Sequence, residues 1–253
     1  MYLCNAMNRF QHDSVVPYKA SELGKKEQVA AMFNNIAFRY DFLNRFLSAG
    51  IDIRWRKKAL SQLSELNPKK ILDVATGTAD VAIMASKKLN PEKIIGIDIS
   101  EGMLEIGRKK ISHLKLDHII ELKNGDSENI QFESDSFDAV TVAFGVRNFQ
   151  DLEKGLSEIR RVLKPGGKLV VLEFSKPTAP VISQLYRFYM KVLTPALGRL
   201  FSKNREAYAY LDESISKFPE GNSFLTVMNG VGFVDYYQKK LSLGICSIYC
   251  GRK

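Results

Sequence analysis

The sequence predicts an α/β protein whose core is a doubly wound, mostly parallel β-sheet with helices on both faces. From Lys70 onward, short apolar runs alternate with amphipathic stretches, which is the pattern of buried parallel strands joined by helices. The Lys-Pro-Gly-Gly turn at 164–167 ends one helix and starts the next strand. Near the C-terminus, a short link that includes residues 242–244 joins two strand-like runs, which indicates an antiparallel hairpin at a sheet edge.

Hydrophobic periodicity places the individual elements. The expected strands are 71–75, 94–99, 119–123, 137–143, 169–174, 233–239 and 245–249. The expected helices are 22–46, 52–66, 81–89, 102–113, 152–163 and 223–230. The chain is therefore expected to form a seven-stranded sheet with a helical region before it.

Two parts of the chain are expected to have different roles. Residues 1–66 form an N-terminal arm and a helical cap over the active site, and residues 1–20, which lack periodicity, are expected to be loose. Residues 67–253 form the sheet domain. A helical lid is expected to be inserted into that domain at about 178–217.

The composition is that of an ordinary globular protein. No apolar run is long enough to cross a membrane, and the first ten residues lack the pattern of a signal peptide, so a cytoplasmic location is expected. Cys4, Cys246 and Cys250 have no second Cys or His pair near them. Neither a disulfide framework nor a metal site is expected.

A glycine-containing loop follows the first predicted strand, at the position where doubly wound sheets bind ligands. This loop, 73–80, reads Asp-Val-Ala-Thr-Gly-Thr-Ala-Asp. Gly77 allows the backbone to approach a ligand closely, and Thr78 offers a hydroxyl and an amide near a helix N-terminus. Asp73 and Asp80 place negative charge at the two ends of the loop.

Acidic residues also end the next two predicted strands. Asp98 lies 21 residues after Gly77, where an acid can accept hydrogen bonds from the two hydroxyls of a ribose. Asp126, followed by Ser127, can receive an adenine amino group. Caps of helices would explain one or two such acids but not three at successive strand ends.

The loop favours S-adenosylmethionine over a nicotinamide dinucleotide as the cofactor. A dinucleotide fingerprint needs three glycines beside the pyrophosphate, whereas Gly77 stands alone and Ala75 occupies an earlier glycine position. Acids would repel a pyrophosphate, but they suit a sulfonium and an α-amino group. The sequence therefore predicts a Rossmann-like class I methyltransferase, and Ala143 at the end of the fourth strand is assigned to the same cofactor site.

Four segments resemble the menaquinone and ubiquinone biosynthesis C-methyltransferases, from about Glu27 to the C-terminus. They are 40–55, with Tyr-Asp-Phe-Leu-Asn, Leu-Ser-Ala-Gly and Trp55; 144–148, Phe-Gly-Val-Arg-Asn; 161–177, which includes Leu-Glu-Phe-Ser-Lys-Pro; and 208–219. The Lys-Pro-Gly-Gly turn is common to many methyltransferases. The Phe-Gly-x-Arg-Asn and Leu-Glu-Phe-Ser-Lys-Pro segments together are more specific to this family.

Two positions depart from the family pattern. A His-Arg pair usually precedes the tryptophan, where this chain has Asp52 and Ile53, and the usual methionine before Asn44 is Leu43. The loss of the histidine argues against proton transfer at that position and for a role in orienting the N-terminal helix. It also favours demethylmenaquinol over the ubiquinone-path substrate, because the histidine is typical of the dual-substrate relatives.

The resemblance implies methyl transfer from S-adenosylmethionine to a ring carbon of a reduced, prenylated quinone, converting demethylmenaquinol to menaquinol. It implies that Arg147 polarises or binds a quinol oxygen, directly or through a water, and that Asn148 orients this oxygen. The alternative is that Arg147 pairs with an Asp or Glu and holds its loop. Tyr40 faces the cofactor or closes the entrance by the same resemblance, and its periodicity equally fits a core aromatic.

Several alternatives remain open at this point. Lysine and arginine exceed aspartate and glutamate by 37 − 28 = 9, which suits an anionic membrane surface, nucleic acid or simply a solvated face. A basic lid suits transient, peripheral membrane contact. No motif for nucleic-acid methylation is seen, so no nucleic-acid partner is expected, and a homodimer is left open. Methylation of ubiquinone precursors or another lipid-like molecule, or a non-catalytic cofactor-binding role, are the competing functions.

Overall fold

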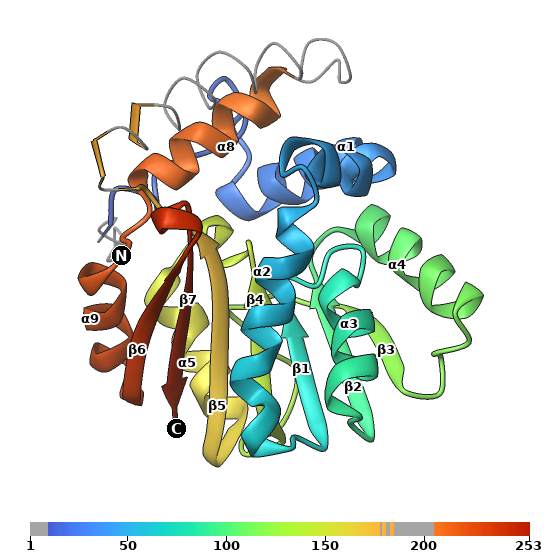
Figure 1. Ribbon diagram of the computed structural model, residues 1–253. Coiled ribbons are helices and arrows are strands. Elements are labelled where there is room, and N and C mark those ends of the chain that lie inside the picture. The colour runs from blue at the N-terminus through green and yellow to red at the C-terminus, as the bar shows by residue number, and fades with distance from the viewer. Residues whose placement is uncertain (1–9, 178, 181–182, 185–204) are drawn as a thin grey trace, which may run out of the picture.

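Seven strands form one sheet in the order β3-β2-β1-β4-β5-β7-β6 (Figure 1). The computed structural model describes residues 10–177, 179–180, 183–184 and 205–253. The strands are β1 (Lys70–Val74), β2 (Lys93–Asp98), β3 (Ile120–Asn124), β4 (Phe137–Ala143), β5 (Leu163–Phe174), β6 (Val234–Leu241) and β7 (Cys246–Arg252). The first five pair in parallel, whereas β7 is antiparallel to β5 and to β6. The predicted mostly parallel sheet with an antiparallel edge hairpin is confirmed.

Helices cover both faces of the sheet. Their bounds are α1 (Lys25–Leu47), α2 (Ile51–Leu60), η1 (Ser61–Leu66), α3 (Asp80–Leu89), α4 (Glu101–His113), η2 (Val146–Asn148), α5 (Leu152–Val162), α8 (Arg205–Lys217), α9 (Asn222–Gly230) and η4 (Ser242–Gly244). The single helix expected at 52–66 is divided into α2 and the 3₁₀ turn η1. Of the lid expected at about 178–217, α8 lies within the described residues and most of the remainder lies outside them.

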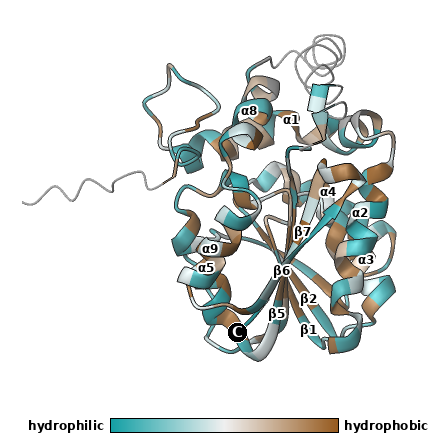
Figure 2. Ribbon diagram, turned by 60° about the vertical axis from the view of Figure 1, so that its left-hand side comes forward, coloured by the Kyte–Doolittle hydropathy of each residue, from teal (hydrophilic) through white to brown (hydrophobic). Residues whose placement is uncertain are grey.

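Two buried clusters lie on opposite faces of the sheet. Leu60 of α2 and Ala82 of α3 belong to one cluster, and Leu156 of α5 and Phe224 of α9 belong to the other. Figure 2 views the sheet nearly edge-on, with α2 and α3 on one side and α5 and α9 on the other. Neighbouring strand residues alternate between the clusters because successive side chains of a strand point to opposite faces. Burial on both faces explains why the strands are almost continuously apolar.

A third, smaller cluster joins the N-terminal region to α1 and α8. Val15 and Tyr18 pack with Val29 of α1 and with Tyr210 of α8, and the side chain of His12 is fully buried. The expectation of a loose arm is therefore wrong for residues 10–20. Their apolar side chains are too few and too irregular to show a period, yet they fill the space between two helices. Figure 1 shows α1 and α8 beyond the carboxyl ends of the central strands.

Strand β5 begins earlier than expected. Leu163 follows α5 directly and pairs with Phe137, and the register shifts before Lys168 pairs with Ala139. Gly166, at φ 76°, lies inside this irregular segment. The Pro-Gly-Gly sequence thus forms a bulge within an extended segment, where a left-handed glycine is tolerated, and not a loop that precedes the strand.

Across the described residues, no helix is both long and apolar enough to span a membrane.

Candidate active site

A cavity opens at the carboxyl ends of β1, β2 and β4, beneath α1. It contains about 650 Å³ of empty space, part of which is open to solvent. This is the edge of a doubly wound sheet at which ligands bind. Its wall consists of residues from α1 and α4 and from the ends and following loops of four strands, β1 to β4: Lys26, Val29, Phe33, Tyr40, Ala75, Gly77, Asp98, Ile99, Met103, Gly125, Asp126, Ser127, Glu128, Ala143, Phe144, Gly145, Asn148, Phe149 and Gln150.

Most of the site residues expected from the sequence meet at this cavity. Those in its wall are Tyr40, Gly77, Asp98, Asp126, Ser127, Ala143 and Asn148. Asp73, Thr78 and Arg147 are not among the residues of the wall, although Arg147 donates to the carbonyl oxygen of Phe144, which is. The structure therefore brings seven of the expected residues together in one wall, and their roles in binding stay predictions.

Asp98 connects two loops of the cavity. Its Oδ2 accepts a hydrogen bond from the Gly77 N–H at 2.8 Å, and its Oδ1 accepts one from the Ser100 N–H at 2.9 Å. Burial raises the pKa of this carboxyl, although the backbone N–H groups oppose that shift. Each carboxylate oxygen can accept further hydrogen bonds. Asp98 can thus hold the loop in place and still bind a ribose.

Asp73 supports the same loop from inside the protein. Its two oxygens accept hydrogen bonds from the hydroxyls of Thr76 and Thr141, both at 2.6 Å. Burial raises the pKa of Asp73 to about 6, against the effect of these two hydroxyls. Asp73 therefore supports the loop 73–80, because the hydrogen-bond donors to its carboxylate are side chains of the protein.

The backbone of the cavity loops is unusual. Ala75, Gly77 and Ala79 have φ angles of 53°, 55° and 65°, and Phe144 in the neighbouring loop has φ 58°. Left-handed conformations at non-glycine residues cost free energy and are concentrated at functional sites. The two loops also touch, since a Cβ placed on Gly145 would lie 2.6 Å from the Ala75 Cβ. A glycine is therefore required at Gly145 by close packing, and the sequence did not reveal this requirement.

One end of the cavity is closed by a lysine from α1. Lys26 Nζ lies 2.7 Å from Asp126 Oδ2 and 2.8 Å from Glu128 Oε2. Glu128 in turn accepts hydrogen bonds from the N–H groups of Gln150 and Asp151. These contacts join α1 to the loops after β3 and β4. Sequence reasoning missed Lys26 and Glu128, because no local pattern brings residues 100 positions apart together.

Tyr40 lines the cavity from α1. Burial raises the pKa of its phenol, and the charge of Arg147 acts in the opposite direction. Its ring packs edge-on against Phe33, with the ring centroids 5.9 Å apart. The position agrees with a residue that contacts a ligand, and the role itself remains a prediction.

Arg147 lies in η2 and forms a buried ion pair. Its Nη1 is 2.8 Å from Glu173 Oε1 and also donates to the carbonyl oxygen of Phe144. The Arg147 side chain is 6 % exposed and the Glu173 side chain 1 %. The ion pair is the alternative that the sequence left open for Arg147. It does not decide between the two roles, because a paired arginine can also present charge to a neighbouring ligand.

Asn148 follows Arg147 and does line the cavity. Its Oδ1 accepts a hydrogen bond of 3.1 Å from the hydroxyl of Tyr210 on α8. Tyr210 is buried, and burial raises the pKa of its phenol. The cavity is therefore bordered by a phenol that donates to the amide oxygen of Asn148, and Tyr210 is a site residue that the sequence did not single out.

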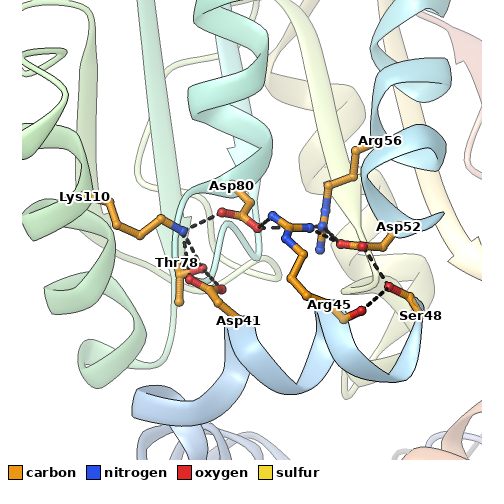
Figure 3. A network of polar contacts seen from close by, with 8 residues as sticks. All are labelled: Asp41, Arg45, Ser48, Asp52, Arg56, Thr78, Asp80 and Lys110. Atoms are coloured by element: carbon orange, nitrogen blue, oxygen red, sulfur yellow. Dashed lines mark hydrogen bonds and ion pairs between the residues drawn. The ribbon is translucent and has the colours of Figure 1, made fainter. Parts of the chain in front are cut away.

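A balanced network of charges attaches the N-terminal helices to the loop 73–80 (Figure 3). Asp80 contacts Arg45 of α1 at 2.7 Å and also pairs with Lys110 of α4. Thr78 donates to Asp41 of α1 at 2.6 Å. The positive charges of Lys110, Arg56 and Arg45 lower the pKa of Asp80, although its burial acts in the opposite direction. Thr78 thus contacts the cap and not the cavity wall.

Asp52, where the family pattern has a histidine, lies inside this network. Its side chain is 5 % exposed and pairs with Arg45 and with the buried Arg56. Ser48 donates a further hydrogen bond of 2.8 Å to it. The position orients the N-terminal helices, as the sequence suggested.

Replacing Asp52 by alanine is expected to lower the free energy of unfolding by about 3 kcal/mol, because the buried Arg56 would lose its nearest counter-charge. Urea unfolding followed by circular dichroism measures the change. The control is Glu121→Ala, which removes an exposed carboxylate that pairs with Lys93 and Lys123 and should cost well under about 1 kcal/mol. Equal losses in the two variants would contradict a structural role for the network.

Among the described residues, no group of His, Cys, Asp and Glu could hold a metal ion. Cys246 and Cys250 are buried in β7, and burial raises the pKa of both thiols.

Sequence comparison identifies the family. The model of the ubiE/COQ5 methyltransferase family matches residues 21–253. The chain belongs to the ubiE/COQ5 methyltransferase family. It is 46 % identical to a demethylmenaquinone methyltransferase of Bacteroides fragilis, over 96 % of this chain and 99 % of the relative. It is 45 % identical to a ubiquinone/menaquinone biosynthesis C-methyltransferase of Geotalea daltonii, over 93 % of this chain and all of the relative.

Solved structures share the fold of this ubiE/COQ5 methyltransferase. Human N-acetylserotonin methyltransferase in complex with S-adenosylmethionine has a TM-score of 0.62 at 16 % identity, covering 91 % of this chain and 60 % of its own. An S-adenosylmethionine-dependent methyltransferase of Thermotoga maritima has a TM-score of 0.61 at 19 % identity, covering 88 % and 99 %. The expected class I fold, the methyltransferase activity and the S-adenosylmethionine cofactor are confirmed by the family and the fold together.

Proposed function

We propose that this methyltransferase transfers a methyl group from S-adenosylmethionine to a ring carbon of demethylmenaquinol and forms menaquinol. The observation that carries the proposal is the 46 % identity, over 96 % of the chain, to a protein named demethylmenaquinone methyltransferase. The cavity supports it, because acidic groups at strand ends line the same wall as the amide of Asn148, which suits a phenolic oxygen.

The residues of the cavity fit S-adenosylmethionine. Asp98 lies in the wall at the end of β2, where a carboxylate accepts hydrogen bonds from ribose hydroxyls. Asp126 and Ser127 lie at the end assigned to adenine. Carboxylates around the cavity suit a sulfonium and an α-amino group. When bound, this group supplies a methyl group activated by the positive sulfur.

The remaining chemistry belongs to the protein. The chain must place the ring carbon in line with the methyl–sulfur bond and exclude water, and Tyr40, Phe144 and Phe149 provide an apolar wall for this. Asn148 is assigned to orient a quinol hydroxyl. The positive charge of Arg147 is assigned to stabilise the oxygen as its proton leaves. Arg147 does not take that proton, because a guanidinium stays protonated.

Purified protein with labelled S-adenosylmethionine and either demethylmenaquinol or its ubiquinone-path counterpart tests the proposal. The expected result is labelled menaquinol. Methylation of only the ubiquinone-path quinol would reject the proposal in favour of the second candidate, which is supported by the 45 % identity to the Geotalea daltonii protein. Label in bulk RNA and in neither quinol would reject both.

We further propose that the protein meets its substrate at a membrane surface as a peripheral protein in the cytoplasm. The formal net charge of +9 and the 91 % exposed ring of Phe38 on α1 support this location. Sedimentation with anionic vesicles and not with zwitterionic vesicles is the expected result. The division into a cap of residues 1–66 and a methyltransferase domain of 67–253 with a lid remains a proposal, as does a homodimer.

A further inference from the structure

Glu173 is a buried acid with no role in the chemistry described so far. It lies near the end of β5, one residue before its last residue, and its exposed fraction is 0 %. An ionised carboxylate is costly to bury unless it is paired and hydrogen-bonded. Such a group in the interior therefore requires an explanation in either the fold or the reaction.

The two oxygens of Glu173 have unequal partners. Oε1 accepts hydrogen bonds from the Phe174 N–H at 2.9 Å and from Arg147 Nη1 at 2.8 Å. Oε2 has a long contact of 3.5 Å with the backbone N–H of Arg147. The carboxylate therefore holds Arg147 by both its side chain and its backbone. This double contact fixes the η2 turn. Asn148, the last residue of that turn, lines the cavity.

Arg147 has an unmet requirement of its own. Its Nε is buried and has no hydrogen-bond partner among the described residues. Its guanidinium carbon lies 5.6 Å from the centre of the Phe174 ring. A buried donor without a partner requires an explanation, and an acceptor on a bound ligand would supply one.

We propose that Glu173 is a positioning residue for methyl transfer, which holds the Arg147 guanidinium and the η2 turn so that Arg147 and Asn148 address the same hydroxyl of the quinol ring. This inference rests on the proposed function. The ionised form of Glu173 is the active one, because a neutral Glu173 loses its electrostatic attraction for Arg147. The charge of Glu173 then governs the rate of methyl transfer, whereas S-adenosylmethionine binding depends on Asp98 and is independent of it.

Ionisable groups on three elements face Glu173. They are Arg147 on η2, Tyr210 on α8, and Cys246 and Tyr249 on β7. Burial raises the pKa of Glu173 and also those of the two phenols and the thiol. Arg147 stays protonated and is the positively charged partner of Glu173 among these groups. As the pH falls through the raised pKa, Glu173 takes up a proton and the rate is expected to fall.

The test compares the wild type with Glu173→Gln, which keeps the volume and one acceptor oxygen but removes the charge. With saturating S-adenosylmethionine, kcat for quinol methylation is expected to drop at least about tenfold, since the pairing to Arg147 is charge-assisted. The wild-type fall in kcat at low pH that belongs to Glu173 should be absent from the variant. Asp73 also titrates, with a pKa raised to about 6, but it does so in both proteins and creates no difference between them.

Further measurements distinguish a positioning role of Glu173 from a folding defect of the variant. The affinity for S-adenosylmethionine and the melting temperature report whether the variant is folded, and Glu173→Asp, which keeps the charge, should recover part of the lost rate. Infrared difference spectra of wild type minus Glu173→Gln report the ionisation of Glu173 without any substrate.

An unchanged kcat and pH profile in a folded Glu173→Gln protein overturns the inference. So does a Glu173 that stays protonated across the active pH range, or a Glu173→Asp protein no more active than Glu173→Gln. A wild type that methylates neither quinol refutes the proposed function instead.

Discussion

Replacing Asp98 by asparagine is expected to weaken S-adenosylmethionine binding about 100-fold, because one unmade hydrogen bond to a charged group costs about 1.5–3 kcal/mol. Both carboxylate oxygens are already acceptors for the N–H groups of Gly77 and Ser100. An asparagine has one acceptor oxygen, so its NH₂ would face one of these N–H groups. The variant thus disturbs the loop and removes an acceptor for the ribose. Isothermal titration with S-adenosylmethionine measures the change.

The matched control is Asp117→Asn, which alters an exposed acid in the turn before β3. It makes the same change in charge far from the cavity wall and should leave the dissociation constant within about twofold of wild type. An Asp98→Asn protein that binds as tightly as the control would remove Asp98 from the cofactor site.

Replacing Arg147 is expected to lower kcat with little change in cofactor affinity. Lysine keeps the charge but lacks the planar guanidinium whose Nη1 donates to both Glu173 and the Phe144 carbonyl oxygen, so Arg147→Lys should lose about 100-fold in kcat. Arg147→Met, which also removes the charge, should lose about 1,000-fold, in the range found for groups that stabilise a developing oxyanion. Methyl transfer from labelled cofactor to the quinol measures both rates.

Stability must be measured alongside these rates, since Arg147→Met leaves a buried carboxylate without its partner. Arg252→Lys on β7, where the guanidinium donates to the Gly166 carbonyl oxygen at the surface, is the control for the chemical change itself. A folded Arg147→Met protein with wild-type kcat would establish the alternative role, in which Arg147 holds its loop and its charge does not act on the substrate.

The parts of the fold that could be predicted are those determined by nearby residues. The alternation of strands and helices and the acid at Asp98 follow from local pattern, because buried parallel strands are apolar and end at the ligand side of the sheet. The start of β5 was misplaced because Gly166 is equally compatible with a loop and with a bulge. The packing of residues 10–20 was missed, since burial there depends on α8, almost 200 residues later.

In the candidate site too, residues that follow a local pattern could be predicted, whereas residues that depend on distant contacts could not. Seven of its expected residues do line the cavity. Lys26, Glu128, Tyr210 and Glu173 were not assigned to it, because each acquires its role from a contact across the fold: Lys26 with Asp126, and Tyr210 with Asn148. The ion pair of Arg147 with Glu173 joins residues 26 positions apart, which a sequence pattern could offer only as an alternative.

Helix α1 touches the cavity surroundings at both ends. Lys26 near its start pairs with Asp126 and Glu128, and Asp41 near its end accepts a hydrogen bond from Thr78. Movement of α1 away from the sheet therefore requires the contacts near both of its ends to break. We expect cofactor release to depend on this movement, because α1 forms part of the cavity wall and the ion pairs of Lys26 oppose its displacement. Added salt, which screens partly exposed charges, should shorten the time for which spent cofactor stays bound.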